Sequence, residues 1–303
     1  MLATRILVGL GISVLLLAGS LWLLWEQLPI RSIWPYLQKR PFVIEGEVQK
    51  VTFVGEHAGE QTYYVYLPKG YNNSDKRYRT LYHLHGAFMR EAWTSRECNY
   101  IGAKMEEAAA VGIIEPMIIV CLVDPDGDRM WSDSYDGRYL TSTGFIQDLI
   151  PHVDETYRTV AARNGRALQG FSMGGFGTIT NGFRAPELFS ALIVWDGAIH
   201  NWQTLSTNRT SIASKMFARE AYFADWSPWT LTEKGAAVEI DLFMVVGEMA
   251  ATRDFGNRFK PHLESTGRQF VYYDSPCPHS IFCMMDELSD KSFTFLANSF
   301  SRN

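Results

Sequence analysis

The stretch Arg166-Ala167-Leu168-Gln169-Gly170-Phe171-Ser172-Met173-Gly174-Gly175-Phe176-Gly177 contains the pattern G-x-S-x-G. A short apolar run precedes it and residues that can begin a helix follow it, which is the strand–turn–helix context of a nucleophile elbow. Such a turn strains the serine backbone, so Gly170 and Gly174 must be small where strand and helix pass close together, and Gly175 lets the helix approach the sheet. The stretch predicts that Ser172 lies at the tip of the turn as a nucleophile. A glycine-rich turn with an incidental serine is the alternative.

The composition is that of a globular chain with a large apolar core. The 303 residues are 47% hydrophobic and 14% aromatic, which is enough for one large α/β domain or two small ones. The formal net charge is −5, and no dense run of Lys and Arg occurs. We therefore expect no nucleic-acid partner.

Residues 6–25 are almost wholly apolar. At about 1.5 Å per residue, a helix of this length could span a bilayer core of about 30 Å. Small residues at 18–20 would suit a signal peptidase, but the apolar run continues beyond them, so we favour an uncleaved membrane anchor over 1–27. Basic residues on both sides leave the orientation open. From the general behaviour of signal anchors we expect a catalytic domain in the periplasm or outside the cell, secreted if the segment is cleaved.

A proline-containing linker is predicted over 28–41, followed by one folded domain over 42–303. Helical patterns at 97–111 and 143–157 alternate with strand-like runs, and this β-α-β succession predicts a mostly parallel central sheet flanked by helices. The predicted strands cover residues 48–54, 62–67, 80–85, 117–123, 167–169, 192–195, 242–246 and 270–273.

Several motifs occur in the order found in one protein family. They are Tyr64-Val65-Tyr66-Leu67-Pro68, Tyr82-His83-Leu84-His85-Gly86, Phe145-Ile146-Gln147-Asp148-Leu149-Ile150-Pro151, Tyr157-Arg158, the stretch 170–177 and Pro186-Glu187-Leu188-Phe189. From about Glu47 to Leu288 the chain resembles the putative-esterase family of α/β-hydrolases, which includes esterase D, feruloyl esterases and mycolyltransferases. The resemblance implies an α/β-hydrolase fold and a serine carboxylic-ester hydrolase that uses no metal and no organic cofactor.

A serine hydroxyl is a weak nucleophile and needs an adjacent base, which in this fold is a histidine after the last strand. His279 lies just beyond the strand predicted at 270–273, where the family places its catalytic histidine. Cys277 and Cys283 flank His279 closely enough to allow, but not to require, a disulfide.

An oxyanion hole needs two backbone N–H donors directed at the developing negative charge. The geometry of the elbow makes Met173 one of them. The second donor should come from the loop after the strand at 80–85, where the resemblance points to Ala87, with Phe88 as its nearest competitor. We expect His85 to brace this loop rather than to act as a base.

The triad acid departs from the family pattern. An aspartate is expected about three residues after Gly247, but Ala250 stands there. Asp254 ranks first as the acid, Glu248 second, and Asp196, which follows the preceding strand, third. Asp254 could instead cap the helix that follows it, and Glu248 could be a solvated loop carboxylate.

The stretch between Trp195 and Ala237 is rich in aromatic residues, namely Trp202, Phe217, Tyr222, Phe223, Trp226 and Trp229. They form either an aromatic cover for an apolar or aryl acyl group or the packing of a helical insertion. The sequence thus predicts a serine esterase that acts through an acyl-enzyme on a small-molecule or glycan-linked ester. The alternatives are an acyltransferase to a sugar or another alcohol, and a membrane-tethered binding protein without catalysis.

Overall fold

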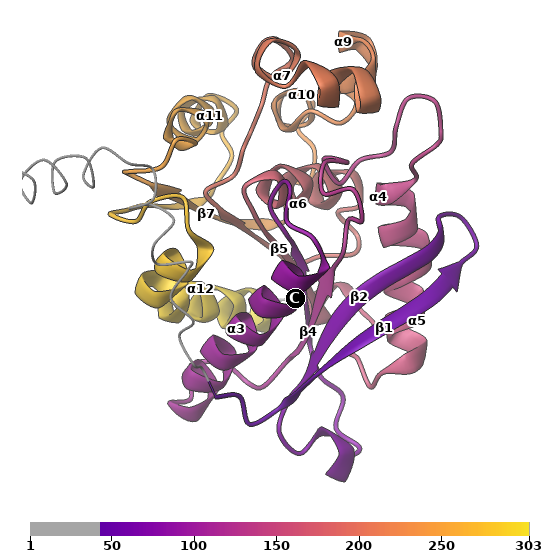
Figure 1. Ribbon diagram of the computed structural model, residues 1–303. Coiled ribbons are helices and arrows are strands. Elements are labelled where there is room, and N and C mark those ends of the chain that lie inside the picture. Colours follow the sequence, from indigo (N-terminus) through magenta and orange to yellow (C-terminus); the bar gives the residue numbers. More distant parts are fainter. Residues whose placement is uncertain (1–42, 303) are drawn as a thin grey trace, which may run out of the picture. The chain divides into compact units, whose positions relative to one another are not determined.

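A central twisted sheet organises residues 43–302, the part of the chain that the computed structural model describes (Figure 1). In this part the strand order is β1-β2-β4-β3-β5-β6-β7-β8. β1 and β2 form an antiparallel hairpin, β2 pairs antiparallel with β4, and all other neighbours are parallel. The predicted mostly parallel sheet is confirmed. The strands are β1 (Glu47–Gly55), β2 (Gly59–Leu67), β3 (Thr80–Leu84), β4 (Ile118–Leu122), β5 (Arg166–Phe171), β6 (Ala191–Trp195), β7 (Asp241–Gly247) and β8 (Val271–Ser275).

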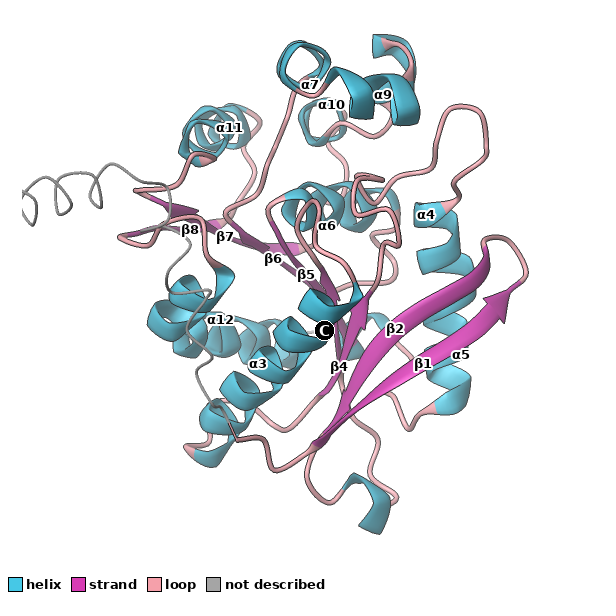
Figure 2. Cartoon of the chain, in the orientation of Figure 1, coloured by secondary structure: helices cyan, strands magenta, loops and turns pink. Residues whose placement is uncertain are grey.

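Helices cover both faces of the sheet (Figure 2). The longest two, α3 (Glu91–Ala110) and α12 (Ile281–Arg302), share one apolar cluster, and α6 (Met173–Arg184) and α11 (Arg253–Ser265) belong to the cluster on the opposite face. The central strands are buried on both faces, as the strands of parallel sheets usually are. The remaining helices are α4 (Thr141–Thr143), α5 (Ile150–Thr156), α7 (Trp202–Asn208), α8 (Thr210–Ile212), α9 (Glu220–Ala224) and α10 (Pro228–Glu233). Short 3-10 or π segments are η1 (Tyr71–Asn73), η2 (Gly144–Leu149), η3 (Arg163–Gly165) and η4 (Ala213–Phe217).

The insertion between β6 and β7 carries α7 to α10, seen at the top of Figure 1. Phe217, Phe223 and Trp226 are buried there, and the rings of Phe217 and Phe223 meet edge to face with centroids 5.0 Å apart. Phe223 also stacks on Phe176 of α6, at 6.1 Å. For these side chains the structure supports the packing interpretation, because their rings hold the insertion onto α6. Trp202, Tyr222 and Trp229 remain partly exposed.

The predicted anchor (1–27) and linker (28–41) lie outside the described residues. Between residues 43 and 302, no helix combines the length and the apolarity needed to cross a bilayer.

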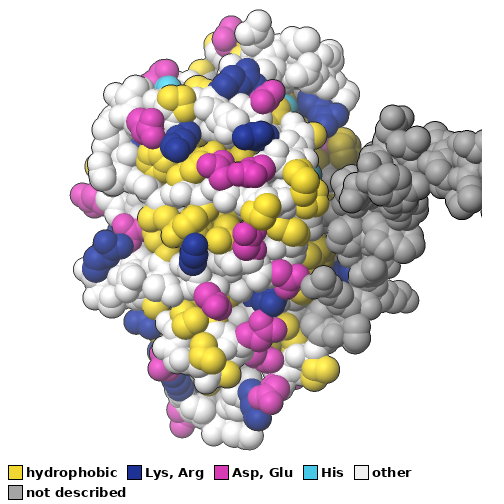
Figure 3. Space-filling model, turned by 90° about the vertical axis from the view of Figure 1, so that its left-hand side faces the viewer, with side chains coloured by type: hydrophobic (Ala, Val, Ile, Leu, Met, Phe, Trp, Pro, Cys, Tyr) yellow, Lys and Arg dark blue, Asp and Glu magenta, His cyan; other side chains and the backbone are white. Residues whose placement is uncertain are grey.

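Figure 3 shows the face of the molecule that lies on the left in Figure 1. Basic and acidic side chains are interspersed on this face, with apolar patches between them. This face is therefore not a continuous basic surface of the kind that attracts nucleic acid.

Candidate active site

Ser172 lies in the sharp turn between β5 and α6, with φ 57° and ψ −115°. A Cβ on Gly174 would lie 1.8 Å from the Leu84 carbonyl oxygen, and one on Gly170 would lie 2.2 Å from the Gly174 oxygen. No real side chain tolerates such distances, so only glycine allows β3, β5 and α6 to approach one another here. The structure thus has the strand–turn–helix arrangement that the sequence predicts, with Ser172 at its tip.

Ser172, His279 and Asp196 form a continuous line of hydrogen bonds. The Ser172 Oγ lies 3.0 Å from His279 Nε2, and His279 Nδ1 lies 2.5 Å from Asp196 Oδ2. The serine and the aspartate are buried, whereas the histidine side chain is 32% exposed. The three residues come from the turn after β5, the end of β6 and the loop after β8. Because parallel strands end at the same edge of a sheet, residues 83 and 107 positions apart meet there.

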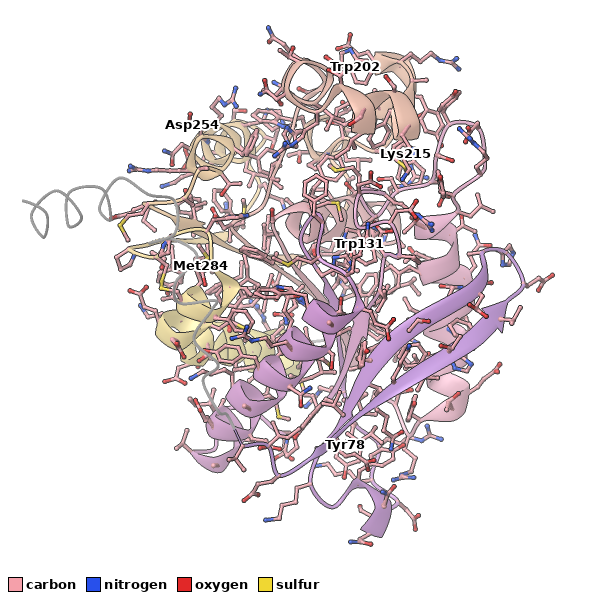
Figure 4. All side chains as sticks on the ribbon, viewed as in Figure 1. Tyr78, Trp131, Trp202, Lys215, Asp254 and Met284 are labelled. Atoms are coloured by element: carbon pink, nitrogen blue, oxygen red, sulfur yellow. A yellow bond between two sulfur atoms is a disulfide. The ribbon has the colours of Figure 1, made fainter. Side chains whose placement is uncertain are left out.

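The carboxylate beside His279 is therefore Asp196, which the sequence ranked third. Asp254, ranked first, is exposed in the first turn of α11, where its charge complements the helix dipole (Figure 4). Glu248, ranked second, is exposed just beyond β7. Asp254 faces solvent because the chain turns directly after β7. The Ala250 N–H donates to the Gly247 carbonyl, and α11, which carries Asp254 in its first turn, begins only three residues later.

Asp196 is also held by groups other than histidine. Its Oδ1 accepts from the Gly247 N–H at 3.3 Å, and its Oδ2 accepts from the Thr252 hydroxyl at 2.6 Å. Thr252 Oγ1 lies 3.0 Å from His279 Nδ1 as well. Thr252 belongs to none of the sequence motifs that predict a site residue. No spacing motif could have identified it, because its position depends on the pairing of β6 with β7.

These contacts determine where the imidazole proton sits. An ionised carboxylate only accepts hydrogen bonds, so the nitrogen facing Asp196 must carry the proton. His279 Nε2 is then left with its lone pair and accepts the Ser172 O–H. The arrangement can therefore remove a proton from the serine hydroxyl.

The two expected oxyanion donors are the N–H groups of Met173, the residue after the serine, and of Ala87, in the loop after β3. Met173 is the first residue of α6, so its N–H has no partner within the helix. The Ala87 N–H makes no hydrogen bond to any residue between 43 and 302, whereas the Phe88 N–H donates to the Gly127 carbonyl at 2.6 Å. A Cβ on Gly86 would lie only 3.2 Å from the Ser172 Cβ, so this loop packs against the serine. The geometry thus favours Ala87 over Phe88.

The loop that carries Ala87 is braced by His85. Its Nδ1 donates to the Gly86 carbonyl at 2.8 Å, and its Nε2 accepts the Asp124 N–H at 2.9 Å. Burial lowers the pKa of His85, which keeps the ring neutral, so one ring nitrogen can donate a hydrogen bond while the other accepts one. The Trp131 indole N–H adds a bond of 3.1 Å to the His85 carbonyl.

Ion pairs join the segment after Asp124, which contacts His85, to the insertion between β6 and β7. The Lys215 ammonium of η4 lies 2.8 Å from Asp126 and 2.5 Å from Asp128, and Arg129 lies 3.1 Å from Asp126. Hydrogen bonds from Arg129 and Lys215 lower the pKa of Asp126 to about 2. Figure 4 shows Lys215 close to the helices of the insertion, α7 to α10, and Trp131 below them. The insertion is thereby tied to the segment that supports the Ala87 loop.

A disulfide joins Cys277 to Cys283, with Cα atoms 5.8 Å apart. The sequence allowed this bond without requiring it. The bridge closes a seven-residue loop that contains His279, and Cys283 already lies in the first turn of α12. His279 is thus held on one side by β8 and on the other by a covalent link to a long helix.

Replacing both Cys277 and Cys283 with alanine is expected to lower the free energy of unfolding by about 2 kcal/mol, because a short loop is no longer closed. The looser His279 should reduce kcat/KM for a simple ester on the order of 10-fold. Denaturant unfolding and ester turnover measure the two effects. Reductant should affect the wild type in the same way and leave the double variant unchanged. A reduced wild type with full activity would contradict this role of the disulfide.

No group of three or more His, Cys, Asp or Glu side chains between residues 43 and 302 is arranged to hold a metal ion.

The sequence also matches a known protein family. Residues 56–244 match the family described as "Putative esterase". An endo-1,4-beta-xylanase/feruloyl esterase of Xylanibacter ruminicola is 34% identical over 164 residues, which are 50% of this chain and 21% of that protein. An esterase of Mycobacterium tuberculosis is 34% identical over 120 residues, which are 38% of this chain and 24% of that protein. The matches thus span between a fifth and a quarter of the length of these relatives.

Among solved structures, a ferulic acid esterase aligns with a TM-score of 0.71 at 20% identity, covering 85% of this chain and 100% of its own. At that identity the likeness shows the fold. The family match covers more than half of the sequence, and the strand order and elbow agree with it. The chain therefore belongs to the putative esterase family of α/β-hydrolases, a family of carboxylic-ester hydrolases.

Proposed function

We propose that this protein is a serine carboxylic-ester hydrolase with Ser172, His279 and Asp196 as its triad. The observation that carries the proposal is the unbroken hydrogen-bond line from Ser172 Oγ through His279 to Asp196. In the first step Ser172 Oγ bonds to the ester carbonyl carbon while His279 Nε2 takes the hydroxyl proton. Asp196 stays ionised and stabilises the imidazolium that forms.

The carbonyl oxygen becomes negatively charged as the serine adds to the carbon. In this proposal the backbone N–H groups of Met173 and Ala87 donate to that oxygen; the Met173 N–H has no partner within α6, and the Ala87 N–H has none among the described residues. Collapse of the intermediate breaks the bond to the alcohol oxygen, and His279 returns its proton to the departing alcohol. An acyl-enzyme on Ser172 remains.

A water molecule that gives its proton to His279 would then release the acid. The histidine side chain is 32% exposed, so solvent reaches part of the ring. This exposure favours hydrolysis over transfer to a sugar or another alcohol. Product analysis with and without added sugar acceptors tests the choice, since acyl sugars among the products would show transfer.

The proposed substrate is an ester with an apolar or aryl acyl group, free or linked to a glycan. Two relatives are named for feruloyl or ferulic acid esters, whose acyl group is aromatic. In this chain the ring of Phe88, next to the proposed oxyanion donor Ala87, is 65% exposed. An apolar ring exposed to solvent, two residues after the glycine that packs against the serine, offers a contact surface for such an acyl group.

We also propose that the domain works outside the cytoplasm, attached through the apolar run at residues 6–25. The disulfide supports this location, because structural disulfides persist mainly in oxidising compartments. Protease treatment of spheroplasts tests it: digestion only after lysis of the spheroplasts would place the domain in the cytoplasm.

A fluorophosphonate probe tests the proposed function directly, because it reacts with a serine that has an adjacent base. We expect it to modify Ser172 in the native protein on the order of 100-fold or more faster than in the denatured protein. Peptide mass spectrometry identifies the modified residue, and Ser172→Ala is the control that must remain unlabelled. Equal labelling of native and denatured protein would instead favour the non-catalytic binding protein.

A further inference from the structure

Thr252 lies where the hydrogen bonds of Asp196 and His279 converge. Its hydroxyl oxygen is 2.6 Å from Asp196 Oδ2 and 3.0 Å from His279 Nδ1. It reaches them from the loop between β7 and α11, an element that carries neither of the two residues. The line from Ser172 to Asp196 therefore has a branch at its acid end.

The chemistry of the three groups fixes the direction of each bond. A hydroxyl has one proton, and the carboxylate can only accept, so Thr252 donates to Asp196. The threonine oxygen then faces the proton on His279 Nδ1 with a lone pair. That proton is shared between Asp196 Oδ2 and Thr252 Oγ1. Both contacts favour the same tautomer, which leaves His279 Nε2 free to accept from the serine.

Thr252 lies at the N-cap of α11, but its side chain does not cap the helix. Thr252 is the residue before the first turn of α11, where a threonine side chain ordinarily accepts from a backbone N–H of the helix. Its hydroxyl makes no such cap bond and is directed to Asp196 instead. The helix end thus forgoes a common stabilising contact, and the side chain is committed to the triad.

The position of Thr252 depends on a close approach between loops. Gly247 ends β7, and a Cβ there would lie 2.7 Å from the Cys277 carbonyl oxygen. The missing side chain lets the chain after β7 pass beside the loop of His279. The Ala250 N–H then closes a turn onto the Gly247 carbonyl, and Thr252 follows two residues later.

We propose that Thr252 is a positioning residue that aligns Asp196 with His279 and holds the imidazole in its reactive tautomer. The proposal rests on the function proposed for Ser172, His279 and Asp196. Thr252 does not touch the reacting atoms. Its loss should therefore slow the chemical step and leave substrate binding unchanged.

The test uses Thr252→Val, which keeps the shape of the side chain and removes the hydroxyl, and Thr252→Ser, which keeps the hydroxyl. With a p-nitrophenyl ester, the valine variant should lose about 10- to 100-fold in kcat at an unchanged KM. The serine variant should stay within about threefold of the wild type. Thr266→Val is the matched control, because Thr266 lies at the other end of α11 and, among the described residues, its hydroxyl bonds only to the Leu263 carbonyl, at 2.8 Å. A purely structural role would lower the melting temperature of Thr252→Val and leave its kcat intact, which would overturn the proposal.

A second readout does not depend on turnover. The proton on His279 Nδ1, in a bond of 2.5 Å, should give a low-field ¹H NMR signal that disappears in His279→Gln. We expect this signal to move in Thr252→Val and to stay in place in Thr266→Val. If the wild type shows no serine-dependent turnover but the signal moves, the proposed function fails and the role of Thr252 in the network stands. A signal that is the same in Thr252→Val and the wild type would overturn the proposal.

Discussion

Replacing Ser172 with alanine should lower kcat for short-chain p-nitrophenyl esters by about 10⁶-fold, the cost of removing the nucleophile from a serine–histidine pair. The methyl side chain cannot form the acyl-enzyme, so only the oxyanion donors and substrate binding would remain to assist direct attack by water. His279→Ala should cost about as much as Ser172→Ala. The double variant should be no slower than either single variant, because the two residues act as one unit.

Initial rates with the full-length protein measure the loss. Ser206→Ala is a suitable control, since Ser206 lies on α7 and, within residues 43–302, its hydroxyl bonds only to the Gln203 carbonyl, at 3.4 Å. Circular dichroism must show that the Ser172 variant is folded. Turnover by Ser172→Ala within about tenfold of the wild type would exclude an acyl-enzyme on this residue.

Asp196→Asn should lower kcat by about 10⁴-fold while leaving the fold intact. The amide has nearly the same shape as the carboxylate but carries N–H donors in place of one acceptor. If the amide group donates to His279 Nδ1, the imidazole proton moves to Nε2, which can no longer accept from Ser172. The negative charge that stabilises the imidazolium is also lost.

The chain offers two matched controls for this substitution. Asp254→Asn and Glu248→Gln also remove a carboxylate, but both side chains are exposed. Each should change kcat by less than about threefold, since exposed charges contribute little at a distance. A larger loss in Asp254→Asn than in Asp196→Asn would restore Asp254 as the acid and contradict the assignment drawn from the structure.

The sequence alone could predict the nucleophile turn because its requirements are local. Gly170 and Gly174 lie within a few residues of Ser172, and the strand before them and the helix after them have their own apolar patterns. The strand–helix alternation likewise predicted the parallel sheet. His279 could be located from its place after the last strand, together with the resemblance to the family.

The acid could not be located in this way, because the ends of β6 and β7 are neighbours and either could supply it. Trp195 pairs with Val245 across these strands, so the residues that follow each strand emerge side by side. The turn at Gly247 and the start of α11 then direct Asp254 to solvent and Thr252 to His279. These directions result from packing between segments far apart in the chain, which a local pattern does not encode.

The same division holds for the oxyanion loop and the disulfide. The sequence identified the loop, but only the bond from the Phe88 N–H to Gly127, in a different segment, left Ala87 as the available donor. The sequence also allowed a Cys277–Cys283 disulfide, and the path of the chain around His279 brings the two cysteines close enough to form it. The fold, the turn that carries Ser172 and the place of His279 after the last strand could be predicted from the sequence, because each depends on short-range pattern and chain order. The approach of Asp196 and Thr252 to His279 could not be predicted in this way, because it depends on which side chains meet at the shared edge of the sheet.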